Sequence, residues 1–139
     1  MTDFGLVQKK LALVESYVAD LRRLAQLDRI DTDVRERRFV EHTLQLAIQA
    51  CLDAASHLVS IERLGEPKTN RALFGLLARA GWIDTPMSET MFRIVGFRNI
   101  LVHGYASVDL GVVREVVEHR LDDLLGFVEA VRRRVHSAP

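Results

Sequence analysis

The sequence predicts an all-α protein, an antiparallel bundle of about five helices that forms a single domain over residues 1–139. Apolar residues recur at three- and four-residue steps through most of the chain, which is the period of a helix with one buried face. No segment carries the turn residues that join two β-strands. Short loops connect the predicted helices, and helices joined in this way pack side by side in alternating directions.

The first predicted helix spans about residues 3–28, and the second spans about 34–64 after a polar break at 31–33 that suits a helix cap. In the first helix the inward positions are Leu6, Val7, Leu11, Val14, Val18, Leu21, Leu24 and Ala25. The second helix carries a regular polar stripe of Glu41, Gln45, Gln49, Asp53, Ser56 and Ser60.

Small residues occupy the other side of the second helix: Ala47, Ala50, Cys51, Ala54 and Ala55. Small side chains let another helix approach closely, so this face is either a tight contact within the chain or a seam between two copies. Free cysteine is among the most buried residue types, and we expect Cys51 in the core.

Three further helices complete the predicted bundle. The third begins after a cap at Thr69 or Asn70 and ends at Ala80, and Trp82 and Ile83 pack beneath the turn that follows. The fourth enters at 85–86, with proline at its first helical position, and ends at Gly104. The fifth runs over about 109–135 as one continuous helix.

Composition narrows the classes of function. Nineteen basic residues balance nineteen acidic ones, so no net field draws the chain to nucleic acid, and any RNA contact must come from a local cluster. The single cysteine cannot form an internal disulfide, which fits a reducing cytoplasm. No uninterrupted apolar stretch reaches the roughly 18 residues of a membrane span, and no signal peptide is recognisable, so we expect a cytoplasmic protein without a membrane partner.

The segment 97–105, Phe-Arg-Asn-Ile-Leu-Val-His-Gly-Tyr, places polar residues at the end of an apolar helix. The apolar positions Met91, Phe92, Ile94, Val95, Phe97, Ile100, Leu101 and Val102 surround that helix almost completely, so it should be buried. A guanidinium at Arg98 is costly there unless something pairs with it. A salt bridge to Asp53 or Glu115 would satisfy it, as would a substrate or a second subunit.

His103 is expected at or near the end of this helix, because Gly104 suits the left-handed position just past a helix terminus. The helix dipole favours a protonated imidazole at that end, whereas the nearby Arg98 opposes it. We therefore expect His103 to titrate near neutral pH.

The spacing of these residues is unusual. An arginine followed five residues later by a histidine is expected by chance roughly 0.6 times in this composition, and it occurs at Arg37, Arg98 and Arg114. A tyrosine two residues further on lowers the chance expectation to about 0.01, and only the segment from Arg98 to Tyr105 meets that condition.

This R-x4-H-x-Y pattern resembles the signature of HEPN domains, and within them the HepT-like toxins. The match covers Arg98, His103 and Tyr105, with Asn99 as the polar residue that commonly follows the arginine in that family. A second likeness lies in residues 44–53, which resemble the family's second helix. With the length and helix order, the resemblance covers nearly the whole chain.

The resemblance implies the toxin of a type VII toxin–antitoxin pair, a homodimeric ribonuclease that needs no metal or other cofactor. Arg98 and His103 would be catalytic at a cleft between two subunits, with Asn99 in support. A cognate MntA-like nucleotidyltransferase antitoxin would transfer AMP to Tyr105 and neutralise the toxin, in a larger assembly of both proteins.

The side chains themselves support such chemistry. A histidine can take a proton from a ribose 2′-hydroxyl or give one to the leaving oxygen, while an arginine binds the phosphate as its charge develops. One histidine serves poorly as both acid and base in one step, and a homodimer would supply two. The alternative is a non-catalytic HEPN module that binds a nucleotide or protein and partners a nucleotidyltransferase.

The remaining histidines and basic clusters have structural interpretations. His42, His57, His119 and His136 lack the spacing of metal ligands and are expected at the surface or at caps. The clusters at 35–38 and 132–134 are expected on solvated helix faces rather than at phosphate sites.

Overall fold

The computed structural model describes residues 3–103 and 108–137, except for the side chain of His103. Within these ranges the chain forms six α-helices and one short 3-10 helix, which confirms the all-α prediction. The elements are α1 (Gly5–Leu24), η1 (Leu27–Arg29), α2 (Val34–Ile61), α3 (Asn70–Arg79), α4 (Thr85–His103), α5 (Leu110–His119) and α6 (Leu121–Ser137).

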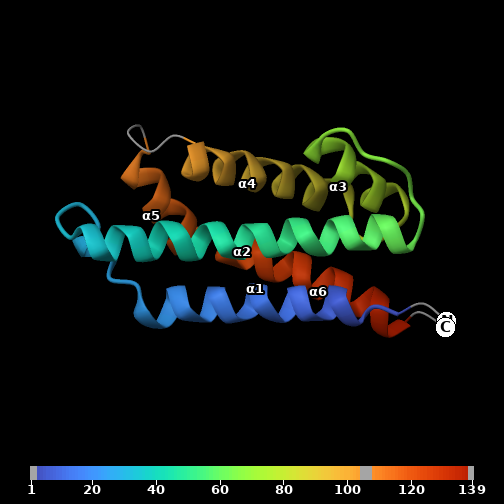
Figure 1. Ribbon diagram of the computed structural model, residues 1–139, viewed down its shortest axis with the longest axis horizontal. Coiled ribbons are helices and arrows are strands. Elements are labelled where there is room, and N and C mark those ends of the chain that lie inside the picture. The colour runs from blue at the N-terminus through green and yellow to red at the C-terminus, as the bar shows by residue number, and fades with distance from the viewer. Residues whose placement is uncertain (1–2, 104–107, 138–139) are drawn as a thin grey trace.

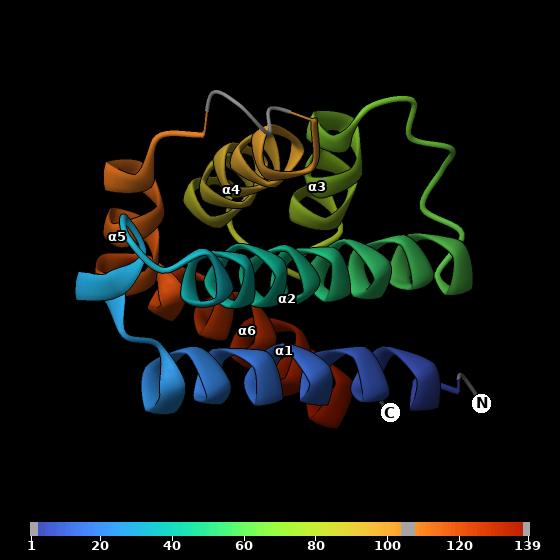
Figure 2. The same ribbon diagram turned by 60° about the vertical axis from the view of Figure 1, so that its left-hand side comes forward.

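The longest helix, α2, runs through the centre of the bundle (Figure 1). α1 lies antiparallel along one side of it, while α3 and α4 lie on the opposite side. Figure 2 shows α6 behind α1 and α2, and α5 at the end of the bundle where α2 begins. Four helices therefore contact α2, namely α1, α3, α4 and α6.

The start of α2 and its small-residue face follow the sequence pattern. The Asp33 carboxylate accepts hydrogen bonds from the backbone N–H groups of Arg35 (2.9 Å) and Glu36 (3.3 Å), which confirms a cap in the polar break. All five small residues, Ala47, Ala50, Cys51, Ala54 and Ala55, are buried inside the single chain. The face is therefore a contact within the bundle, and burial raises the pKa of the Cys51 thiol.

The first helix is shorter than predicted. α1 ends at Leu24 because Ala25 is extended, and η1 replaces the last predicted turn. Leu6 and Leu24 are 47% and 48% exposed, so their inward assignment was wrong. The buried residues of α1 form a narrow stripe, and both leucines lie about 100° around the helix from it. The stripe consists of Val7, Leu11, Val14, Val18 and Leu21.

The predicted fifth helix is two helices. Arg120, with φ −118° and ψ −2°, separates α5 from α6. Neither glycine nor proline marks this break, and the apolar period continues across it. Asp122 and Asp123 lie in the first turn of α6, where carboxylates stabilise a helix N-terminus. Those two acids are the only local signal of a new helix start in the sequence of this region.

The caps of α3 and α4 differ in how well the sequence predicted them. Thr69 caps α3 as predicted, since its hydroxyl accepts a 3.0 Å hydrogen bond from the backbone N–H of Ala72. At α4 the cap is Asp84, whose carboxylate accepts from the backbone N–H of Met87 at 2.8 Å. Pro86 is consequently the second helical residue, not the first. Trp82 and Ile83 are buried beneath the turn, as predicted.

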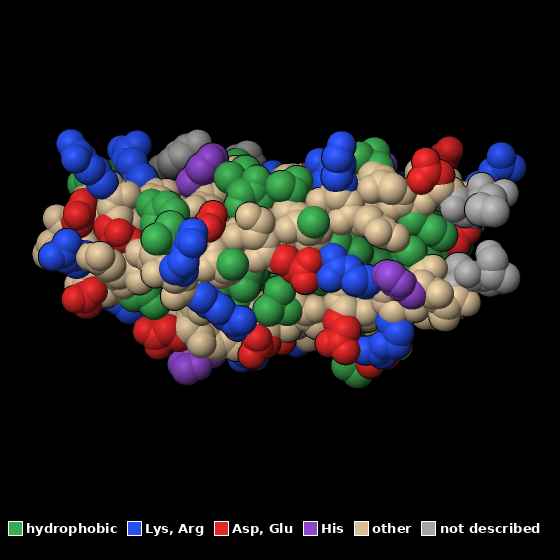
Figure 3. Space-filling view, turned by 90° about the horizontal axis from the view of Figure 1, so that it is seen from below, with side chains coloured by type: hydrophobic (Ala, Val, Ile, Leu, Met, Phe, Trp, Pro, Cys, Tyr) green, Lys and Arg blue, Asp and Glu red, His purple; other side chains and the backbone are tan. Residues whose placement is uncertain are grey.

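The surface is mixed in charge. Figure 3 views the molecule from below Figure 1, where α1 lies, and basic and acidic side chains are interspersed on that face. Among the described helices, α2 is long and apolar enough to cross a membrane, but half of its most apolar 18-residue window is buried in the bundle. A core helix of a bundle passes the same test of length and composition.

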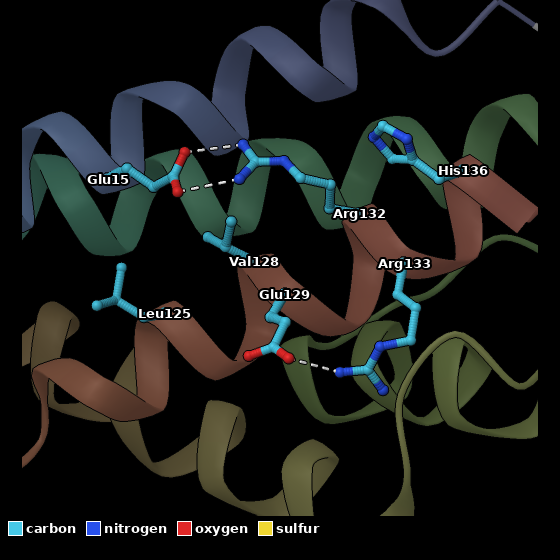
Figure 4. Close-up of a pocket in the computed structure, with 7 residues that line it drawn as sticks. All are labelled: Glu15, Leu125, Val128, Glu129, Arg132, Arg133 and His136. Atoms are coloured by element: carbon cyan, nitrogen blue, oxygen red, sulfur yellow. Dashed lines mark hydrogen bonds and ion pairs between the residues drawn. The ribbon is translucent and has the colours of Figure 1, made fainter.

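An ion pair joins the first and last helices. The Arg132 guanidinium on α6 donates two hydrogen bonds, of 3.0 and 2.8 Å, to the Glu15 carboxylate on α1 (Figure 4). Hydrogen bonding to Arg132 holds the pKa of Glu15 below its usual value, although partial burial opposes this. The same pair raises the pKa of Arg132.

We predict that Glu15→Gln lowers the free energy of unfolding at pH 7 by less than about 1 kcal/mol, because the pair is partly exposed to solvent. A carboxyl group with a lowered pKa stabilises the fold above its unfolded pKa and loses that effect as pH falls. The difference between wild type and variant in urea unfolding should therefore shrink progressively as pH falls below about 4.3, the usual pKa of glutamate.

Glu129→Gln is the matched control, because Glu129 pairs with Arg133 within one helix and links no two elements. Its effect at pH 7 should be smaller. A Glu15→Gln deficit that is the same at pH 3 as at pH 7 would show that the pairing is not its source.

Candidate functional site

Arg98 lies half-buried on α4, where it faces α2. Its Nη2 donates a hydrogen bond to the side-chain oxygen of Gln49, and its Nη1 donates to the side-chain oxygen of Asn99 at 3.0 Å. The prediction that the Arg98 guanidinium is paired is therefore confirmed. The proposed salt bridges to Asp53 and Glu115 are wrong, because the two groups that accept from Arg98 are neutral amides.

The amide of Gln49 is itself oriented by further contacts. Its Nε2 donates to Asp53 one turn along α2, at 2.9 Å. The other carboxylate oxygen of Asp53 lies 3.3 Å from the Lys10 ammonium on α1. A continuous set of polar contacts thus runs from α1 through α2 to Arg98, and it fixes the Gln49 oxygen, rather than its nitrogen, toward the guanidinium.

This arrangement leaves the charge of Arg98 available. Among the described residues no carboxylate lies within 4.0 Å of its guanidinium, and the closest one in the contact chain, Asp53, pairs with Lys10. The Arg98 Nε is buried and has no hydrogen-bond partner within the described part of the chain. An unsatisfied buried donor costs about 1–3 kcal/mol. A guanidinium that is not neutralised can bind an anion such as a phosphate.

The other signature residues lie at the end of α4. Asn99 is exposed, and His103 is the last described residue of α4. Five residues advance an α-helix by about 7.5 Å, so Arg98 and His103 lie between one and two turns apart along α4. Gly104 and Tyr105, for which we expected a left-handed turn and a modification site, lie outside the described residues.

α4 is less buried than the sequence predicted. Met91, Val95 and Leu101 are in the core, but Ile100 is 51% exposed. Val112 on α5 is 44% exposed and lines a groove of about 270 Å³ between α4 and α5. The apolar residues of α4 therefore divide between the core of the bundle and an exposed face beside the signature.

Comparison with known proteins identifies the family. Residues 8–131 match the family model described as ribonuclease HepT-like. The chain belongs to this family. The match includes the whole site, from Lys10 through Gln49 and Asp53 to Arg98 and His103, and the resemblance seen in the sequence is confirmed.

Two HepT-like relatives are nucleases by name. The chain is 38% identical over 89 residues to the mRNA nuclease HepT of Shewanella oneidensis, over 64% of this chain and 67% of that protein. It is 26% identical over 128 residues to the tRNA nuclease HepT of Aphanizomenon flos-aquae, over 91% of this chain and 87% of that one.

The fold matches that of a HEPN toxin of known structure. The tri-AMPylated Shewanella oneidensis HEPN toxin, solved in complex with MNT antitoxin, superposes with a TM-score of 0.85 and 29% identity. The superposition covers 93% of this chain and 98% of that one. The HepT-like assignment therefore rests on sequence and on three-dimensional structure.

Two residues of the site were not assigned to it from the sequence. Gln49 was recognised as part of a polar stripe, and Lys10 was not singled out. The available signal was the stripe itself, because polar residues recurring along one side of an otherwise buried helix require partners. Which member of the stripe meets Arg98 depends on how far α2 and α4 slide past each other, and that information is not local.

Proposed function

We propose that this chain is the toxin of a type VII toxin–antitoxin pair and that it cleaves RNA without metal, with Arg98 and His103 as its catalytic residues. One observation carries the proposal. The Arg98 guanidinium is held between α2 and α4 by neutral amides, on a helix that ends five residues later at His103. The nuclease relatives support the reaction class.

In the proposed reaction Arg98 binds the phosphate at the cleaved bond. Its Nη1 donates to the exposed Asn99, whereas its Nη2 donates to the half-buried Gln49. Asn99 supports the site by orienting Nη1. His103 removes the proton of the 2′-hydroxyl, which attacks the adjacent phosphorus as the bond to the 5′-oxygen breaks. DNA lacks the attacking hydroxyl and is not cleaved by this route.

A homodimer completes the proposed site. A second proton must reach the leaving 5′-oxygen, and a second copy of His103 supplies the donor. A cleft between two copies would bring two Arg98 and two His103 residues to one substrate. The exposed Ile100 and Val112 beside the signature are apolar side chains that a second subunit would cover.

Regulation is proposed to act on Tyr105. The partner would be an MntA-like nucleotidyltransferase antitoxin, as in the complex of the HEPN toxin with MNT antitoxin, in which that toxin is tri-AMPylated. AMP attached two residues beyond His103 would bring a negative phosphate into the cleft. That phosphate would compete with RNA for the unneutralised Arg98.

We predict that Arg98→Ala and His103→Ala each reduce RNA cleavage by about 10²- to 10⁴-fold, because phosphate stabilisation and proton transfer contribute factors of this size. Wild-type cleavage should persist in excess chelator. The assay follows a labelled RNA under single-turnover conditions, with circular dichroism to confirm that each variant folds.

Arg79→Ala is the matched control, because Arg79 is an exposed arginine at the end of α3, outside the signature and outside the groove that Val112 lines. It should cleave like wild type. Cleavage retained by both signature variants would indicate a contaminating nuclease. A folded wild type that does not cleave and is not toxic, yet binds its nucleotidyltransferase, would favour the non-catalytic module.

A second prediction concerns the modification. Incubation with ATP and the nucleotidyltransferase encoded beside this chain should add adenylyl groups, and Tyr105→Phe should abolish the addition in intact-mass spectrometry. The matched control is Tyr17→Phe, which changes the other tyrosine and should leave the addition intact. Adenylylation of Tyr105→Phe at the wild-type level would contradict the assignment.

A further inference from the structure

We propose that a basic hollow beside Arg98 binds backbone phosphates of the RNA strand next to the cleaved bond. The hollow is lined by Arg37, Arg38 and His42 of α2, and we call it the α2 hollow. This inference rests on the proposed ribonuclease function and extends it by naming residues that hold the substrate away from the reacting atoms.

The α2 hollow has a volume of about 650 Å³ and lies between three segments of the chain. The N-terminal half of α2 contributes the basic residues and Gln45, the end of α4 contributes Leu101, and the start of α5 contributes Leu110. The hollow thus combines basic side chains with the apolar side chains of Leu101 and Leu110 in one concave surface. A strand of nucleic acid presents the complementary pattern of phosphates beside ribose and base.

The hollow adjoins the Arg98 site along both α2 and α4. Gln45 lies one helical turn before Gln49, which binds Arg98, and Leu101 lies three residues after Arg98 on α4. His42 and Arg38 lie seven and eleven residues before Gln49, or roughly 10 and 16 Å along the helix axis. A strand that leaves Arg98 and follows α2 toward its N-terminus therefore passes these basic residues.

The charges in the hollow are only partly balanced. The Arg37 Nε lies 3.6 Å from the Glu41 carboxylate, the single acidic group in the lining. Within the described ranges no carboxylate lies within 4.0 Å of the exposed Arg38 or His42. The lining thus has one uncompensated guanidinium and an imidazole, in a chain whose total charge is zero.

The second basic cluster shows what a structural arginine cluster looks like in the same molecule. Arg132 binds Glu15, Arg133 binds Glu129, and Arg134 donates to the carbonyls of Ala80 and Gly81. Each of those cations has a partner in the fold. The sequence placed both clusters on solvated faces, but only the α2 cluster combines a concave surface, an unpaired cation and proximity to Arg98.

The test measures RNA affinity in a His103→Ala background, which prevents cleavage. A labelled single-stranded RNA is titrated with the parent, with Arg37→Ala/Arg38→Ala, and with the control Arg23→Ala/Arg133→Ala. The control removes the same charge from two exposed arginines that pair only within their own helices. Fluorescence anisotropy is recorded over a range of salt concentrations.

We expect the α2 variant to bind RNA about tenfold more weakly than the control. The slope of log affinity against log salt should become shallower by about 0.7 if only the unpaired Arg38 binds a phosphate and by about 1.4 if Arg37 does so as well, since each single-strand phosphate contact contributes about 0.7. Equal affinities and equal slopes for the two double variants would overturn the proposal.

A parallel cleavage assay of the wild type distinguishes failure of the α2 hollow as an RNA site from failure of the proposed ribonuclease function. If the wild type cleaves RNA and the double variants bind alike, the α2 hollow is not an RNA site and the proposed function stands. If the wild type does not cleave and the parent does not bind RNA, both fall. An α2 variant that keeps its RNA affinity but loses the nucleotidyltransferase would identify a protein docking site instead, which also overturns the inference.

Discussion

The structure of this molecule depends on the placement of one cation, the Arg98 guanidinium, between α2 and α4. Arg98 is half-buried on α4, and its guanidinium donates hydrogen bonds to the neutral side chains of Gln49 and Asn99. A carboxylate at that point would bind the guanidinium more strongly, but it would also neutralise the charge that we propose binds an RNA phosphate. An amide oxygen fixes the cation without neutralising it.

The bundle is built so that this amide has a single orientation. Asp53 accepts from the Gln49 nitrogen and is paired with Lys10, so the Gln49 oxygen is directed at Arg98. α2 can present this polar stripe because its opposite side consists of small residues that allow close helix packing in the core. One side of α2 therefore packs in the core and the other contacts Arg98. The family match likewise covers nearly the whole chain.

Much of this could be predicted from sequence, because apolar periodicity and caps are local signals. The buried stripe of α1 apart from Leu6 and Leu24, a cap within residues 31–33 and the buried Cys51 followed directly. The break at Arg120 did not, because no glycine or proline marks it and the apolar period runs through. The motif from Arg98 to Tyr105, together with residues 44–53, the length and the helix order, carried the resemblance to the family that the family match confirms.

The errors at the site have one physical origin, the register between helices. Asp53 was a candidate partner of Arg98, and the actual partner, Gln49, lies one turn away on the same stripe. A shift of four residues between α2 and α4 would exchange the two. Such a shift is decided by packing over the whole contact between helices, which no local pattern encodes.

The central claim is that the Arg98 charge must remain unneutralised, and Gln49→Glu tests it most directly. This variant puts a carboxylate where the amide oxygen now accepts from Arg98. Ser56→Glu adds the same charge on the same helix, two turns further from the site. Under single-turnover conditions, with both variants shown to be folded, the account predicts that Gln49→Glu cleaves RNA at least about tenfold more slowly than Ser56→Glu. Equal cleavage rates for the two variants would contradict it.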